Sequence, residues 1–169
     1  KIGVILFSDK IEKFIPPKKG RQHILRIIRE LIDFAPQHTQ TDVAEALKYL
    51  TSVIKKRSTA FVISDFISPD FEDAIKIANR KHDVVALNIV DPREMELPPV
   101  GLIQFQDAET GHKKWVDSSD KRVREAFSRQ YSENFQKLKT IFQKSGVDYT
   151  TIDISKDYVI PLMGLFKKR

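Results

Sequence analysis

The apolar segment Thr59–Ser64, which is followed by Asp65, most constrains what this chain can fold into. An apolar run without polar alternation predicts a strand covered on both faces, as in a parallel sheet flanked by helices. Ser68 and Pro69, a few residues further on, are residue types that begin helices. We therefore expect Asp65 at the carboxyl end of a central strand, where open α/β sheets bind ligands. A simple role for Asp65 in the turn explains this stretch equally well.

Strands and helices alternate along the rest of the chain. Apolar runs predict further strands over 2–7, 84–90 and 147–154, and a short antiparallel edge strand over 12–15 that ends at Pro16 and Pro17. Helical spacing predicts helices over 20–34, 41–56, from Ser68 onward, from Ser118 or Ser119 to Ser145, and from no earlier than Asp157. Segments 102–105 and 113–116 predict a β-hairpin across residues 107–111. This order predicts one α/β domain over residues 1–169, with a doubly wound, mostly parallel sheet, an antiparallel edge strand and an inserted hairpin.

Composition excludes several classes of protein. A hydrophobic content of 41% and a charged content of 31% are typical of a globular chain, not of a disordered one. The absence of cysteine excludes disulfides and thiolate metal sites. No apolar run approaches the roughly 20 residues of a membrane span, and no secretory signal is present. We expect a cytoplasmic protein.

The net charge of +6 arises entirely within residues 1–58. A basic patch on the surface there could bind phosphate or an acidic partner; it comprises Lys18, Lys19, Arg21, Arg26 and Arg29. No series of aromatic residues interleaves these charges, so a solvated helix face is the favoured interpretation and nucleic-acid binding a lesser alternative.

The chemistry available to the chain is narrow. It contains no glycine-rich phosphate loop and no G-x-S-x-G nucleophile motif, and its four histidines lack zinc-ligand spacing. Asp65 could be the nucleophile of a phosphatase-like hydrolase, although Ile67 stands where the required second carboxylate is expected. Thr41, just before a predicted helix, and Asp65 supply hard oxygen donors that suit Mg²⁺ or Mn²⁺. Two donors do not complete a site, and a helix cap and a turn remain an alternative role for them.

The order of several motifs resembles the von Willebrand factor A fold, in particular its bacterial branch, the domain-of-unknown-function family fifty-eight. The similarity spans nearly the whole chain. It rests on Gly3–Asp9, Thr41–Leu47, Phe61–Asp65, Leu97–Gly101 and Asp107–Gly111.

This resemblance implies a protein–protein interaction module and not an enzyme. In the related fold, a metal-ion-dependent adhesion site combines an Asp-x-Ser-x-Ser loop, a threonine and an aspartate; Thr41 matches the second component and Asp65 the third. The family is commonly associated with MoxR-type AAA ATPases, which implies a partner and a role in complex assembly.

The first loop of that site is missing, and we expect it to precede Lys1 in a longer chain. Without it, this chain should bind Mg²⁺ or Mn²⁺ weakly or not at all. The strand that carries the loop would lie between segments 2–7 and 59–64. Its absence predicts an open edge, and therefore an oligomer, a strand swap or a rearrangement at that seam.

Overall fold

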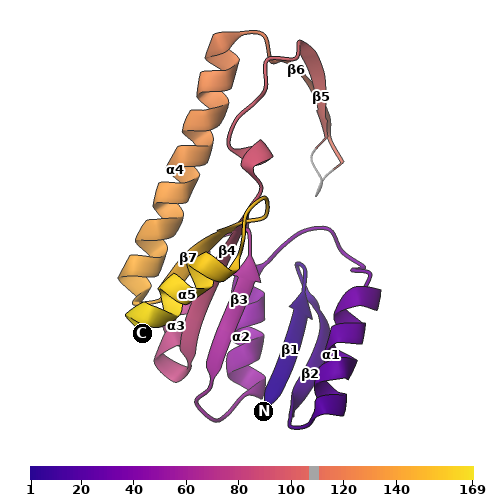
Figure 1. Cartoon of the computed structure of the whole chain (residues 1–169), viewed down its shortest axis with the longest axis vertical. Helices are drawn as coiled ribbons and strands as arrows, with labels where there is room; N and C mark the ends of the chain where they lie inside the picture. Colours follow the sequence, from indigo (N-terminus) through magenta and orange to yellow (C-terminus); the bar gives the residue numbers. More distant parts are fainter. Residues whose placement is uncertain (107–110) are drawn as a thin grey trace.

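The computed structural model describes residues 1–106 and 111–169. Its elements, in chain order, are β1 (Ile2–Phe7), β2 (Ile11–Lys18), α1 (Arg21–Asp33), α2 (Val43–Val53), β3 (Thr59–Ser64), α3 (Glu72–Lys81), β4 (Asp83–Val90), a short 3-10 helix (Pro92–Glu94), β5 (Leu102–Gln106), β6 (Lys113–Asp117), α4 (Lys121–Ser145), β7 (Asp148–Asp153) and α5 (Val159–Lys168). Figure 1 shows their arrangement.

A parallel sheet of order β3–β4–β7 forms the centre of the fold. Val62 pairs with Ala86 across the first ladder, and Leu87 pairs with Thr150 across the second. The connections between these strands contain α3 and α4, as parallel pairing requires. The α/β class predicted from the apolar runs is confirmed.

Helices cover both faces of this sheet because β4 is apolar on both sides. Val84 and Ala86 belong to the larger core, which α2, α3 and α4 close around the fully buried Phe142. Val85 and Leu87 face the other way and pack with Leu165 of α5. The sheet is therefore the middle layer of three.

The β1–β2 hairpin is a separate antiparallel sheet. It pairs Val4 with Ile15, and β1 and β3 are not hydrogen-bonded to each other although their arrows point the same way (Figure 1). On β3, the side chains of Phe61 and Ile63 are 45% and 61% exposed. Among the described strands β1 pairs with β2 and β3 pairs with β4, so the expected open seam between β1 and β3 is present in the structure.

Several predicted boundaries are wrong, among them those of the helix predicted over 41–56, which spans Val43–Val53. Strand β2 does not end at Pro16 but continues to Lys18, because an edge strand tolerates proline where no neighbour needs its N–H. Helix α3 begins at Glu72 and not at Pro69. Ser68, expected to cap that helix, instead accepts a hydrogen bond from the first residue of α2.

The predicted β5–β6 hairpin is present and rises, with the first half of α4, beyond the carboxyl ends of the central strands (Figure 1). Residues 107–110 of its predicted turn lie outside the described residues. Asp120, not Ser118 or Ser119, caps α4, while Gly146 ends it in the left-handed conformation, as predicted. In the described parts of the chain, none of the helices combines the length and the apolar character that crossing a membrane requires.

His82 makes the fold sensitive to acid. Its side chain is 0% exposed, and its Nδ1 lies 3.3 Å from Ser58 Oγ. Burial, reinforced by the charge of Lys81, lowers the pKa of His82 below its ordinary value. The unfolded chain therefore takes up this proton first, so the stability due to neutral His82 is complete above about pH 6.5 and is lost as the pH falls.

We expect His82→Asn to flatten the acid dependence of the unfolding free energy below about pH 6.5, where one proton accounts for at most about 1.4 kcal/mol per pH unit. Urea denaturation between pH 7 and pH 5 measures this slope. Equal slopes in the wild type and His82→Asn would contradict the assignment.

Candidate functional site

Three loops meet at the carboxyl edge of the fold, after β1, before α2 and after β3. The backbone N–H of Asp42 donates to the carbonyl oxygen of Ser8 at 2.9 Å. The next N–H, of Val43, donates to Ser68 Oγ at 3.0 Å. These two hydrogen bonds fix the start of α2 between the ends of β1 and β3. They hold the Thr41 loop beside the Asp65 loop.

The start of α2 is well capped. Asp42 Oδ1 accepts from the N–H of Glu45 at 2.9 Å, so Asp42 caps the helix. Thr41 precedes this cap and is half-buried, and its hydroxyl makes no hydrogen bond with any residue that the structure describes. Within the described structure the Thr41 hydroxyl oxygen is therefore available to bind a ligand, and it lies beside the positive end of helix α2.

Asp65 is exposed immediately after β3, at the expected strand end. The expectation of a central strand covered on both faces is wrong, because β3 is an edge strand of its sheet and Phe61 and Ile63 leave one of its faces exposed. Asp65 Oδ1 accepts from the N–H of Ile67 at 3.1 Å and from Ser64 Oγ at 3.4 Å. The predicted turn-forming role is therefore real, and it leaves the second carboxylate oxygen without a hydrogen bond in the described structure.

Phe66 shapes this turn in a way that the sequence did not reveal. Its backbone is left-handed, with φ of 58°, which is unfavourable for a residue with a bulky side chain. Its ring is buried and meets the ring of Phe142 edge-on at 5.1 Å. Packing thus holds a strained backbone next to Asp65, and such strain occurs often at functional sites.

Thr41 and Asp65 fit Mg²⁺ or Mn²⁺ in donor type but not in donor number. Both offer hard oxygen atoms, which these ions prefer. Across residues 1–106 and 111–169, no three His, Cys, Asp or Glu side chains cluster as a metal centre would require. The structure brings the two loops together without a hydrogen bond between the two side chains. Most of the coordination shell would have to come from water or from another polypeptide.

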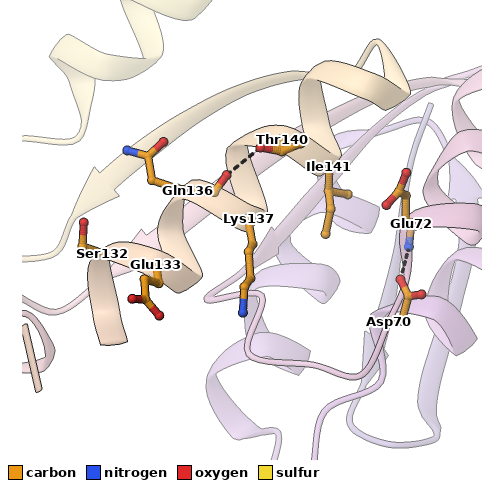
Figure 2. Close-up of a pocket in the computed structure, with 8 residues that line it drawn as sticks. All are labelled: Asp70, Glu72, Ser132, Glu133, Gln136, Lys137, Thr140 and Ile141. Atoms are coloured by element: carbon orange, nitrogen blue, oxygen red, sulfur yellow. Dashed lines mark hydrogen bonds between the residues drawn. The ribbon is translucent and has the colours of Figure 1, made fainter. Parts of the chain in front are cut away.

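Two hollows flank this edge, both against α4. The shallower one, of about 690 Å³, lies between α4 and the start of α3. Figure 2 shows Lys137 and Gln136 on its helical wall, opposite Asp70, whose Oδ1 accepts from the N–H of Glu72 at 2.9 Å. Its polar groups are exposed or already hydrogen-bonded, so it offers little to a specific ligand.

The second hollow, of about 620 Å³, lies between the ends of β3 and β4 and the aromatic face of α4. Asp65, Asn88 and Glu94 line it. Sequence reasoning missed Asn88 and Glu94. For Asn88 a signal existed, because it is the one polar residue within the apolar run 84–90.

The basic patch predicted in the first third is partly neutralised. Arg26 lies 3.7 Å from Glu30, which also forms an ion pair with Lys13 of β2. Glu30 therefore joins α1 to the hairpin, and part of the positive charge serves this contact.

Sequence relatives are uncharacterised mycobacterial proteins. The Mycobacterium tuberculosis protein Rv1480 is 26% identical over 172 residues, which cover 100% of this chain and 54% of the relative. The Mycobacterium avium protein MAV169 is 26% identical over 158 residues, which cover 92% of this chain and 93% of the relative. This chain thus spans about half the length of the Mycobacterium tuberculosis relative.

Two solved structures share the fold. The conserved hypothetical protein BatB from Bacteroides thetaiotaomicron aligns with 98% of this chain and 76% of its own, with a TM-score of 0.55 at 14% identity. An aerotolerance-related membrane protein from Bacteroides fragilis gives a TM-score of 0.54 at 16% identity, over 98% of this chain and 78% of its own. At these identities the similarity concerns the fold alone.

The sequence family described as protein of unknown function DUF58 matches residues 1–137, which include β1, the start of α2 and the end of β3, where the three loops meet. Since this match covers most of the chain, the protein belongs to the DUF58 family.

Proposed function

We propose that this chain is a protein–protein interaction module with an incomplete metal-ion-dependent adhesion site, working with a MoxR-type AAA ATPase in complex assembly. One observation supports it above all: two hydrogen bonds, from Asp42 to Ser8 and from Val43 to Ser68, hold the Thr41 and Asp65 loops at one edge. This edge is where open α/β sheets bind ligands. The proposal assigns no catalytic step to the chain.

Thr41 and Asp65 have separate roles in this proposal. The Asp65 carboxylate binds Mg²⁺ or Mn²⁺ directly or through water, and the Thr41 hydroxyl donates a lone pair to the same ion. The remaining positions are open to water and to an acidic side chain of the partner. The ion would supply a bridge between two negatively charged groups. The protein holds the loops in place through the Ser8 and Ser68 contacts.

We expect this chain to bind Mn²⁺ weakly, because it supplies only two of the required donors. Titration with Mn²⁺, followed by paramagnetic broadening of amide signals in NMR spectra, detects weak binding and locates it. Broadening should begin in the Thr41–Val43 and Asp65–Ser68 loops and should be lost in Asp65→Ala.

The control is Asp73→Ala, which removes an exposed carboxylate at the start of α3 and should leave the broadening unchanged. Broadening that persists in Asp65→Ala, or that is spread evenly over the surface, would refute the proposed site. Metal-dependent phosphoester hydrolysis that is lost in Asp65→Asn would instead favour the hydrolase alternative.

We also propose that two copies of this chain associate at the seam between β1 and β3. Each of these strands has one paired neighbour, β2 and β4 respectively, and one free edge toward the seam. Ile63 and Phe61 stand exposed on β3 beside it. Free strand edges next to exposed apolar side chains favour pairing with another chain.

Sedimentation velocity over a range of concentrations tests this association. We expect a dimer that dissociates on dilution, and we expect Ile63→Lys to shift it to monomer at every concentration. Ile77→Lys places the same charge at a comparably exposed position on α3 and should leave the dimer intact. A wild-type chain that stays monomeric at all concentrations would refute association at the seam.

A further inference from the structure

The cavity between the central sheet and α4 has features that the proposed metal site does not use. It is lined by the residues that follow β3, by the end of β4, and by one side of α4 between Phe127 and Ile141. At about 620 Å³ it falls within the range of cavities that hold small ligands.

The charge of this cavity is negative in a protein whose net charge is positive. Asp65, Asp70 and Glu94 line it, and Lys137 is the one basic side chain among its lining residues. Partial burial raises the pKa of Glu94, and the negative charges of Asp65 and Asp91 raise it further. A cation that entered the cavity would relieve this repulsion.

Aromatic rings provide the opposite wall. Phe127, Tyr131 and Phe135 follow one another at four-residue spacing on α4, so they form a single stripe that lines the cavity. The rings of Tyr131 and Phe135 are stacked at 6.3 Å, and Phe127 stacks on Phe105 of β5 at 5.9 Å. Lys139 Nζ already lies 4.4 Å from the centre of the Phe135 ring, so the stripe does attract cations, and its remaining apolar surface can pack against the stem of a ligand.

Asn88 supplies an independent indication of a ligand. It lies on the central strand β4, is 2% exposed and lines the cavity, and its Oδ1 has no hydrogen-bond partner in the described parts of the chain. A buried acceptor without a partner is unfavourable, and native structures rarely retain one without a reason. A donor group that entered from the cavity would satisfy it.

We propose that this cavity binds a guanidinium or ammonium group carried on an apolar stem. The N–H groups of the ligand donate to the Glu94 carboxylate and to Asn88 Oδ1, and its stem lies along the aromatic stripe of α4. An arginine or lysine of a bound polypeptide and a free polyamine share this chemistry.

The inference goes beyond the proposed interaction module and is tested through Glu94, which has no role in the metal site. Its probe is N-acetyl-arginine amide, followed by chemical shifts of the protein in NMR spectra. The matched control is N-acetyl-citrulline amide, which replaces the guanidinium by a neutral urea of nearly the same shape. The arginine probe should shift the Asn88 side-chain amide and the backbone signals of Glu94 and Tyr131, and the citrulline probe should not.

Glu94→Gln should weaken binding of the arginine probe about tenfold, because a charged acceptor becomes a neutral one. Glu94 and Glu96 are both exposed, but Glu96 lies outside the cavity lining, so Glu96→Gln should leave the affinity unchanged. Titrations with spermidine and with a short arginine-containing peptide then distinguish a free polyamine from a bound polypeptide as the source of the cation. Binding of either one that shifts these same signals and is tighter than binding of the arginine probe supports the site. Equal binding of the arginine and citrulline probes, or an unchanged affinity in Glu94→Gln, would overturn it.

Discussion

The burial of β4 on both faces is the constraint on which the rest of the structure depends. Val84 and Ala86 pack toward three helices, while Val85 and Leu87 pack toward α5. The backbone of β4 is paired with β3 on one side and β7 on the other. Its N–H and C=O groups are therefore hydrogen-bonded although they lie between apolar layers. This arrangement fixes the carboxyl edge, and every candidate functional residue lies at or near that edge.

Hydrogen bonds between loops, and not between strands, join the β1–β2 hairpin side of the molecule to the central sheet at this edge. Ser8 accepts from Asp42 and Ser68 accepts from Val43, so the first turn of α2 acts as the connecting piece. The free N–H groups of a helix start need acceptors in any case, and here residues from two other segments supply them in addition to Asp42. The need of helix α2 for hydrogen-bond acceptors at its start thus determines how the loops of the candidate metal site are arranged.

The sequence predicted the elements whose cause is local. The apolar runs predicted β1, β3 and β4, because the formation of a strand depends on neighbouring residues. Asp65 lies at the expected strand end for the same reason.

The errors and omissions have long-range causes. Ser68 and Pro69 are residue types typical of a helix start, yet the Ser68 hydroxyl accepts from the N–H of Val43 at the start of α2, 25 residues earlier in the chain. The left-handed backbone of Phe66 depends on its packing against Phe142, which no local pattern encodes. Glu94 lines the cavity because α4, which comes later in the chain, packs across the same edge of the sheet.

The open seam between β1 and β3 and the candidate metal site are linked through the loops in which these two strands end. Strand β1 ends next to Ser8 and strand β3 ends next to Asp65, and the two run in the same direction (Figure 1). Any strand that paired in parallel with both would therefore end at the same edge, beside Thr41 and Asp65. Its last residues would be well placed to supply the oxygen donors that these two side chains lack. Binding of a strand along the seam and binding of the cation would then be coupled. A polypeptide bound along β1 and β3 would raise the affinity of the edge for a divalent cation, and the cation would in turn stabilise the bound strand.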